Sequence, residues 1–229
     1  MSENLKNKLG LVLFFMAAVI SLTSCDDNQI DIFGYAKIKI VNAAPHSKTQ
    51  HFFFISGIIA RDLDYSESTN SYLSVKSGDK LAAQFRDQSD GNTIASGSIY
   101  LQNKDRYTIY LAEDNSGRER IYSFKDDLSS PQKGKVKVKF IHLSGTGPSE
   151  VSFSSNTAGV SAEVSRNNQT RYYELNPGPI SISVKKAGQD ENEELSSTST
   201  PQLIEGKIYT IVFTSSYNNS YDLLLFRQI

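Results

Sequence analysis

The chain contains no tryptophan and only one cysteine, Cys25, among its 229 residues. A single cysteine cannot close a disulfide within the chain, so packing and hydrogen bonding must hold the folded part together. Excess charge of one sign is also lacking, since 24 Lys and Arg balance 25 Asp and Glu and the basic residues are spread along the chain. This balance gives no basic footprint for nucleic acid. Hydrophobic residues make up 38% of the sequence, which is enough for a packed core.

The N-terminus has the layout of an export signal. A short basic start with Lys6 and Lys8 precedes the apolar run 9–20, and small residues follow it. The run is too short to cross a hydrocarbon layer of roughly 30 Å as a permanent helix. No second long apolar run occurs later in the chain. We therefore predict a cleaved signal peptide over residues 1–24 and no transmembrane helix.

The last residues of this segment, Leu22-Thr23-Ser24-Cys25, resemble a bacterial lipobox. The resemblance implies cleavage before Cys25 and acylation of its sulfur, so that lipid chains hold the mature protein at a membrane. Each buried CH₂ contributes about 0.8 kcal/mol, and two or more chains give stable anchoring. The alternative for a lone cysteine is an ordinary buried or free thiol. Residues 25–33 are predicted to form a polar tether.

Two acidic residues, Asp26 and Asp27, directly follow the cysteine. They resemble the surface-export signal of lipoproteins in the Bacteroidetes group. The alternative is a hydrophilic spacer that keeps the first domain away from lipid headgroups. The lipobox resemblance implies an outer-membrane lipoprotein, and these two interpretations leave open whether it faces the cell surface or the periplasm.

The remainder of the chain repeats itself once. Residues 34–42 match 134–142 at an offset of 100, and residues 101–109 match 203–211 at an offset of 102. Solenoid repeats span about 20–50 residues, so this longer period predicts two tandem copies of a whole domain. We place the copies at 34–128 and 134–229.

Each copy is predicted to be all-β. Ile38 and Ile40 alternate with Lys37 and Lys39, as in a half-buried strand, and residues 135–140 alternate in the same way. Clusters of Asp, Asn, Gly and Pro between the apolar runs predict turns. Short strands separated by such turns indicate two immunoglobulin-like or transthyretin-like β-sandwiches. Further strands are expected at 51–58, 71–76, 80–86, 94–101, 106–112 and 119–124, and at 149–154, 170–175, 179–185, 200–204, 207–214 and 221–227.

The repeated motifs resemble the DUF4397 domain of bacterial envelope proteins. They are a strand ending in a small-residue turn, a glycine that leads into a second strand, and the pattern L-x(5)-Y-T-I. The second copy departs from the first at Gly145, which stands where the first copy has Pro45. The resemblance implies the fold and an envelope location, and it implies no activity and no catalytic residues. The motif segments are 38–45, 77–79 and 101–109 in the first copy and 138–144, 177–179 and 203–211 in the second.

No motif for a reacting group occurs in the sequence. The histidines His46, His51 and His142 lie outside metal-ligand and catalytic spacings. His142 aligns with Asn42 in the repeat, which indicates a strand-end residue that bonds to backbone. No G-x-S-x-G elbow frames a serine, and no G-x-G-x-x-G loop is present. We therefore predict no enzyme, no cofactor and no metal site.

Two polar segments, 87–92 and 190–200, are predicted to form loops. Residues 87–92 supply several side-chain oxygens and loosely resemble a calcium loop, but the bidentate glutamate is missing. A hairpin tip is the alternative, because tips favour Asp, Gly and Asn. The acidic run 190–194 and the hydroxyl-rich run 196–200 are predicted to form one solvated loop.

Aromatic residues are the remaining lead to a ligand. Phe53 lies within an apolar run that predicts a strand buried on both faces, and an exposed ring available to a partner is the alternative. Sugar faces can stack on tyrosine, although the lack of tryptophan weakens this hypothesis. The tyrosines considered for such stacking are Tyr100, Tyr110, Tyr122 and Tyr217.

The leading hypothesis is a lipid-anchored, non-enzymatic envelope protein that binds a protein or glycan partner or serves a structural role. The first alternative is a subunit or adhesin of a surface assembly, in which the edge strand 221–227 pairs with another chain. The second is an accessory of glycan hydrolysis that uses loop carboxylates.

Overall fold

The computed structural model describes residues 32–188 and 194–229, which belong to one compact unit, Asp31–Ile229. The predicted signal peptide and the residues Leu22, Thr23, Ser24 and Cys25 lie outside the described residues. Within the described ranges, no helix is long and apolar enough to span a membrane. The strands are β1 (Ile32–Asn42), β2 (Gln50–Phe54), β3 (Gly57–Leu63), β4 (Leu73–Asp87), β5 (Thr93–Leu101), β6 (Arg106–Glu113), β7 (Glu119–Lys125), β8 (Val136–His142), β9 (Glu150–Ser155), β10 (Val160–Ser165), β11 (Asn168–Gln169), β12 (Tyr173–Leu175), β13 (Ser181–Lys186), β14 (Glu194–Ser199), β15 (Ile208–Ser215) and β16 (Tyr221–Arg227).

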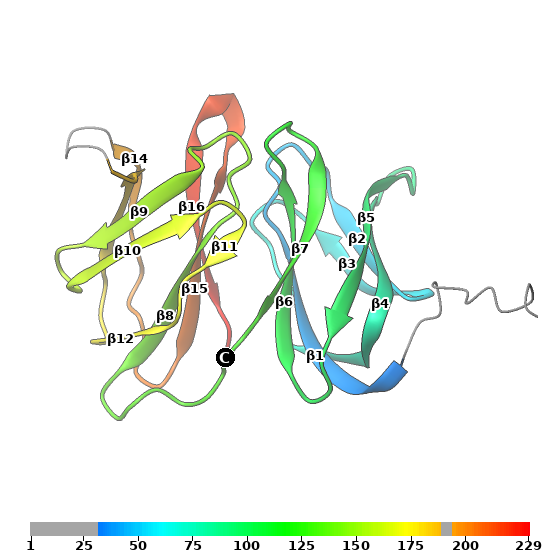
Figure 1. The fold of residues 1–229 in the computed structure, drawn as a ribbon, viewed down its shortest axis with the longest axis horizontal. Coiled ribbons are helices and arrows are strands. Elements are labelled where there is room, and N and C mark those ends of the chain that lie inside the picture. The colour runs from blue at the N-terminus through cyan, green and yellow to red at the C-terminus, as the bar shows by residue number, and fades with distance from the viewer. Residues whose placement is uncertain (1–31, 189–193) are drawn as a thin grey trace, which may run out of the picture. The chain divides into compact units, whose positions relative to one another are not determined.

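The first half of the chain is organised around the long strand β4. The sheet runs in the order β3-β2-β4-β1-β6-β7, and β5 also pairs with β4 (Figure 1). Lys80 interrupts the extended backbone with a positive φ of 50°. The part of β4 before this residue pairs with β1, and the part after it pairs with β2 and β5. One strand therefore contributes to both layers that enclose the first core.

The second half has the same pairing, but two separate strands stand where the first half has the single strand β4, which is interrupted at Lys80. One sheet has the order β10-β9-β13-β14, and the other has β11-β8-β15-β16 with β12 also paired to β8. Strands β12 and β13 together correspond to β4, and the segment 176–178 between them carries Pro177, which has no backbone N–H to donate to a ladder. As β1 runs parallel to β6, so β8 runs parallel to β15.

Single hydrogen bonds repeat as well. The Tyr107 hydroxyl accepts a bond from the Gln102 amide at 3.1 Å, and the Tyr209 hydroxyl accepts one from the Ile204 amide at 3.1 Å. These tyrosines come from the repeated L-x(5)-Y-T-I motif. The motif is therefore a framework element, because each ring fixes the turn that precedes its own strand.

The all-β, sandwich-type fold predicted from the sequence is confirmed, but several strands differ from the prediction. The strand expected at 200–204 is absent, and only Leu203 forms a single bridge there, to Gly178. The run 51–58 is a hairpin and not one strand, because Ile55 takes a positive φ of 58° and turns β2 into β3. Strand β10 was missed, although its residues alternate between buried and exposed. Residues 196–199 are part of β14 and not a loop, since β14 pairs along β13.

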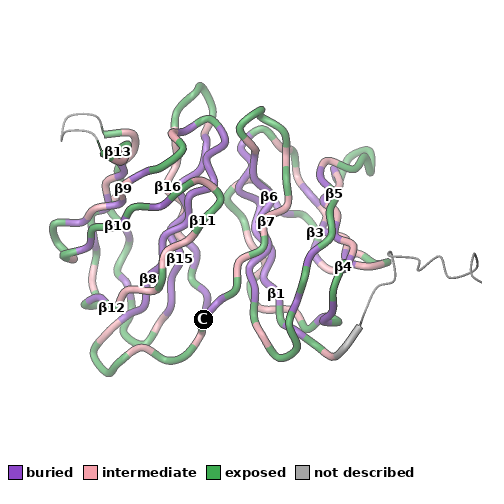
Figure 2. Tube along the Cα trace, in the orientation of Figure 1, coloured by how far each residue is buried: buried purple, intermediate pink, exposed green. Residues whose placement is uncertain are grey.

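Each half has its own apolar core (Figure 2). In the first core the rings of Phe52 and Phe85 lie 4.8 Å apart. Phe53 is only half-buried, so the prediction that both faces of this strand are covered by the core is wrong. The Arg86 guanidinium lies 4.1 Å from the centre of the Phe53 ring and covers it in place of the core.

A third apolar cluster joins the two halves. It combines residues of β1 and β6 from the first half with residues of β8, β15 and β16 from the second. The outer faces of the two sheets are thus buried against each other, and we call this contact the junction. Its buried members are Val41, Ala43, Tyr110, Ala112, Ile141, Leu143, Val212 and Phe226.

Candidate functional site

The junction contains a fully buried ion pair between the two halves. Lys139 Nζ lies 2.6 Å from Asp126 Oδ1, and the two side chains are 1% and 0% exposed. Lys139 also donates to Gln169 Oε1 at 2.8 Å. Burial lowers the pKa of the Lys139 ammonium, and the Asp126 carboxylate opposes that effect. Two charges buried in contact stabilise one another, whereas either one left alone is costly.

The remaining oxygen of Asp126 is also satisfied. Thr108 and Tyr72 donate to Asp126 Oδ2 at 2.7 and 2.9 Å. The Tyr72 hydroxyl lies 2.9 Å from Gln228 Oε1 as well, so it connects the carboxylate to the second half. Burial, and secondly the charge of Asp126, raise the pKa of Tyr72 far above its ordinary value. This hydroxyl is therefore protonated at physiological pH and can donate to the carboxylate.

The junction has an approximate two-fold relation between the repeats. Lys39 on β1 donates to the Arg227 carbonyl at the end of β16, at 2.7 Å. Its repeat counterpart Lys139 on β8 donates to the Lys125 carbonyl at the end of β7, at 3.4 Å. Such reciprocal contacts are the rule in isologous interfaces. Only one of the two lysines meets a carboxylate, because the counterpart of Asp126 is Gln228.

The segment between the halves is fixed to the second half by another lysine. Lys137 Nζ lies 2.8 Å from Asp127 Oδ2 and also donates to the carbonyl and hydroxyl of Ser129. The bond from Lys137, followed by those from Ser129, lowers the pKa of Asp127 to about 2. The connection is held by ionic contacts over its first residues, so the halves are linked by a fixed segment and not by a free hinge.

A cleft opens at this end of the junction, with a volume of about 700 Å³. It is formed by the start of β6, the end of β7 with the connecting segment, and the approach to β12, so both halves contribute to it. We call it the junction cleft. Clefts between domains with converging polar groups are common ligand sites. The lining residues are Lys104, Asp105, Arg106, Lys125, Asp126, Asp127, Leu128, Ser129, Gln169, Thr170, Arg171 and Tyr172.

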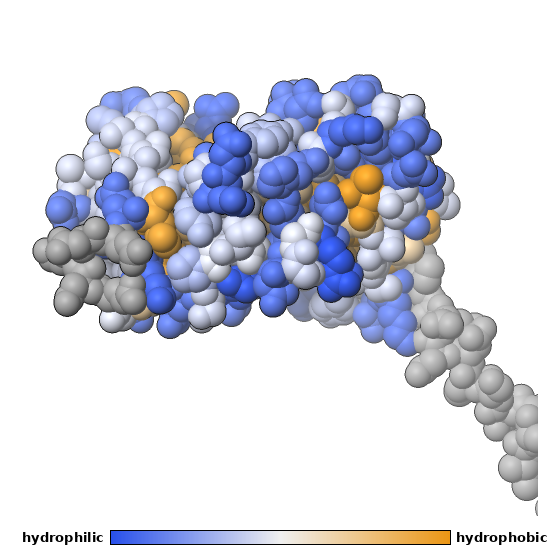
Figure 3. Space-filling model, turned by 90° about the horizontal axis from the view of Figure 1, so that it is seen from above, coloured by the Kyte–Doolittle hydropathy of each residue, from blue (hydrophilic) through white to orange (hydrophobic). Residues whose placement is uncertain are grey.

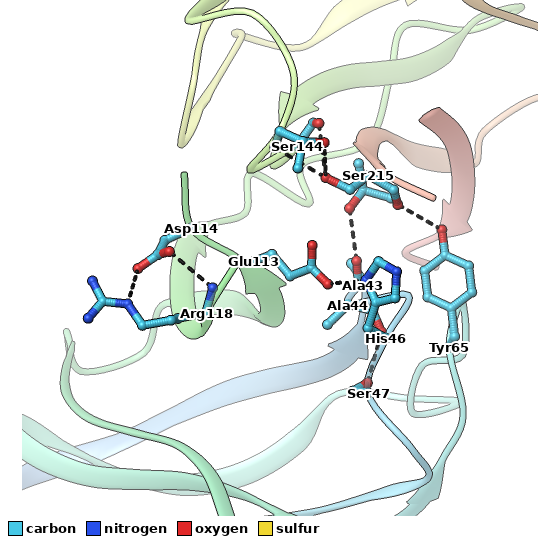
Figure 4. A network of polar contacts seen from close by, with 12 residues as sticks. Ala43, Ala44, His46, Ser47, Tyr65, Glu113, Asp114, Arg118, Ser144 and Ser215 are labelled. Atoms are coloured by element: carbon cyan, nitrogen blue, oxygen red, sulfur yellow. Dashed lines mark hydrogen bonds and ion pairs between the residues drawn. The ribbon is translucent and has the colours of Figure 1, made fainter. Parts of the chain in front are cut away.

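The opposite end of β6 carries a second group of polar residues (Figure 4). His46 Nδ1 lies 2.7 Å from Glu113 Oε1, and the carboxylate is 4% exposed whereas the imidazole is 58% exposed. Tyr65 donates to Asp222 Oδ2 at 2.6 Å and its pKa is raised by burial and by that bond. The ring of Tyr217 meets those of His46 and Tyr65 edge-on. These contacts join loops of the two halves and close the junction at this end.

Hydrophilic residues dominate the view of the molecule from above in Figure 3, and apolar residues show there as small separate spots. The described residues seen in this view therefore form no broad apolar patch of the kind that marks a protein-docking surface.

Gly145 explains why the second copy departs from the repeat. A Cβ at this position would lie 2.2 Å from the carbonyl oxygen of Asp114 in the first half. The backbone of the β6–β7 turn thus occupies the space that Pro45 has in the first copy. The packing between the halves requires glycine here.

Substitution of Gly145 by alanine is therefore expected to lower the free energy of unfolding by about 1–3 kcal/mol, the usual cost of overpacking. Gly97→Ala is the matched control, because a Cβ there meets nothing within 4 Å. Thermal and urea unfolding of the two variants would measure the difference. Equal stability of both variants would contradict the close approach of the two halves at Gly145.

The structure supports the interpretation of His142 as a strand-end residue. Its Nε2 donates to the Pro148 carbonyl at 2.8 Å, and its Nδ1 accepts from the Ser144 amide at 3.3 Å. In the first copy, Asn42 Oδ1 accepts the equivalent bond from the Ala44 amide at 3.1 Å. Burial lowers the pKa of His142 to about 4, so the ring is neutral at physiological pH.

The loop 87–92 forms internal turns. Asp87 Oδ1 accepts bonds from the amide and the hydroxyl of Ser89, and Asp90 Oδ1 accepts from the Asn92 amide. Lys48 lies 3.3 Å from the other oxygen of Asp87. The oxygens are thus used within the hairpin tip. Across the described parts of the chain, no cluster of three His, Cys, Asp or Glu side chains forms a metal site.

The four tyrosines considered as sugar platforms are not brought together. Tyr110 is fully buried in the junction, and Tyr122 packs against the same apolar cluster. Tyr100 and Tyr217 are each 52% exposed, but Tyr217 belongs to the loop group described above. His51 also lies apart from the cleft, with Nδ1 accepting from the Asp62 amide at 3.2 Å.

Sequence reasoning missed the residues that build the junction cleft. Lys137 and Lys139 carry the alternating pattern of a strand with a solvated face, yet they are 5% and 0% exposed because the first half covers them. A signal for the cleft itself was present in the repeat. Lys104 and Arg106 correspond to Gly206 and Ile208, so these cations are not framework residues.

Another hollow, of about 760 Å³, lies over the outer face of the sheet β10-β9-β13-β14. Serine and threonine dominate its lining, and hydroxyls bond across the strands, as between Ser154 and Ser183 at 2.9 Å. The junction cleft differs from it in having charged groups from both halves.

Comparison with known proteins identifies one family. The model of a domain of unknown function, DUF4397, matches residues 36–151, from β1 to the start of β9. No curated protein sequence matches the chain. A solved structure described as "Alpha-glucan binding by a streptococcal virulence factor" is similar over 82% of this chain and 96% of its own, at 11% identity and a TM-score of 0.26. At that level of similarity it carries no argument on fold or ligand.

Proposed function

The chain belongs to the DUF4397 family of domains of unknown function, and from the geometry of the junction we propose that it is a non-enzymatic binding module of the cell envelope. The observation that carries this proposal is the junction cleft, a concave site of about 700 Å³ to which both halves contribute. A site that exists only between two halves needs them fixed, and the buried pair of Lys139 and Asp126 fixes them.

The proposal includes a second copy of the same domain over residues 134–229. The family match ends within the second half, so support for this copy comes from the repeated strand pairing and from the paired bonds of Tyr107 and Tyr209. A duplicated domain that packs on its own copy creates a cleft without any new loop. The lining residues of the cleft accordingly fall outside the fixed positions of the L-x(5)-Y-T-I motif, although Lys104, Asp105 and Arg106 lie at its variable positions.

The proposal also includes a lipid anchor at Cys25, supported by the lipobox-like segment 22–25. An anchored binding module would hold its ligand at the outer membrane. The full chain is expected to fractionate with membranes, and Cys25→Ser is expected to move it to the soluble fraction because the acyl chains supply the membrane affinity. Asn28→Ala, a change in the tether, is the matched control and should leave the protein with membranes.

Two results would overturn parts of this proposal. Cys25→Ser protein that still sediments with membranes would contradict the anchor. Purified full chain that retains no ligand on a glycan array and none from envelope polysaccharide would contradict the binding role.

The alternative of a surface assembly rests on strand β16, which ends its sheet. Its outer edge is approached by β14, and the Ser196 hydroxyl donates to the Tyr221 carbonyl at 3.2 Å. A carbonyl that already accepts a bond is less available to an added strand. We therefore favour the binding module.

A further inference from the structure

We propose that the junction cleft takes an acidic polysaccharide, a chain that carries carboxylate groups at intervals. This inference rests on the proposed binding function and names its ligand class. It begins with three exposed cations on the cleft wall, Lys104, Arg106 and Arg171. Among the described residues, no carboxylate lies within ion-pair distance of any of the three side chains.

The acidic groups of the same cleft are already neutralised. Asp105 pairs with Lys125 at 2.6 Å, and Asp126 and Asp127 pair with lysines of β8. The unpaired charge that remains on the lining is therefore positive. Arginine binds carboxylates in a bidentate manner, so Arg106 and Arg171 suit carboxylate groups better than isolated hydroxyls.

The three cations are not matched by cations at the corresponding positions of the other half. Lys104 and Arg106 correspond to Gly206 and Ile208, and Arg171 corresponds to Ser71. Each half keeps its strand pairing whether or not it has a cation at the position concerned, so these three side chains are distinct from the framework residues. All three fall on the same side of the junction and line the same cleft.

The cleft continues into a smaller hollow of about 240 Å³ that shares Lys104 and Arg106 with it. The second hollow adds Lys37 and the ring of Tyr35, which is 57% exposed. The Lys76 ammonium lies 4.3 Å from the centre of that ring. The ammonium thus covers one face of the ring and also donates to its hydroxyl at 2.7 Å, so stacking with a sugar would use the opposite face. The cations beside the ring supply charge for the acid group of the sugar. This row of cations suits a chain of sugars, whereas a bilayer surface is too flat to enter the concave part.

The experiment measures binding of the purified full chain to polygalacturonate, with neutral dextran as the uncharged comparison. We expect binding to polygalacturonate that weakens as salt is raised, and little or none to dextran. The double variant Arg106→Gln/Arg171→Gln should lower the affinity at least tenfold. Arg118→Gln/Arg120→Gln is the matched control and should bind normally, since both side chains pair with Asp114 at the opposite end of β6.

The outcomes separate the ligand class from the binding function. Unchanged affinity of the Arg106→Gln/Arg171→Gln protein for polygalacturonate would overturn the proposed site. Equal binding of dextran would overturn the acidic ligand while leaving a binding module in place. If the wild-type chain binds vesicles that contain phosphatidylglycerol and binds no polysaccharide, the ligand is a membrane surface and the inference is wrong. If the wild-type chain binds none of these probes and no glycan on the array, both the binding function and the acidic ligand are contradicted.

Discussion

Replacement of Lys139 by methionine is expected to lower the free energy of unfolding by about 3–5 kcal/mol. The change removes the ammonium and leaves the Asp126 carboxylate, which is 0% exposed, without a charged partner. The bonds from Thr108 and Tyr72 remain, but neither carries a charge. Urea unfolding followed by circular dichroism would measure the loss.

Two further variants distinguish the charge from the packing. Lys39→Met removes the repeat counterpart, which donates to the Arg227 carbonyl and is attracted by Asp126 without forming an ion pair with it, and should cost about 1–3 kcal/mol. Lys139→Met/Asp126→Asn removes both charges and should recover a large part of the loss. If Lys139→Met is no more damaging than Lys39→Met, the buried pair does not hold the junction as described.

Acidification from pH 6.5 to pH 4 is expected to destabilise the protein by about 3 kcal/mol through His142 alone. Burial lowers the pKa of His142 in the folded chain to about 4, below the ordinary value of 6.5. The unfolded chain therefore takes up a proton at a higher pH than the folded chain does. The contribution is complete above pH 6.5, is lost as the pH falls, and is gone near pH 4.

His142→Asn tests this directly, because Asn42 makes the equivalent amide contact in the first copy. The variant should remove most of the pH dependence between 6.5 and 4 and keep the dependence at lower pH, where Asp127 titrates. Midpoints of thermal unfolding at several pH values would show it. A wild-type midpoint that does not move between pH 6.5 and 4 would contradict a buried, neutral His142.

The similarity of the two halves and the turn residues between apolar runs predicted the all-β fold. The alternation of apolar and polar residues along the strands predicted which residues lie in the core. Ile38, Ile40, Val138 and Phe140 are all fully buried, as their spacing predicts.

Strand β14 could not be predicted, because it has one apolar residue and depends on pairing with a neighbour for its conformation. Its existence is decided by the sheet that it joins. Strand β10 does carry the alternating signal, in Val160, Ala162 and Val164.

The sequence by itself determined that this chain is all-β and that the faces of β1 and β8 alternate between apolar residues and lysine, and it predicted two similar halves. The tertiary structure alone decided what covers the lysine face. Alternation specifies which residues share a face, but a face with lysines can meet either solvent or another sheet, and the two cases have the same spacing. Lys139 is buried because Asp126, thirteen residues earlier in the chain and on the other half, reaches it across the junction. The junction cleft has the same origin, since Lys104 and Arg106 come from the first half and Arg171 from the second, and only the packing of the two halves brings them to one cleft.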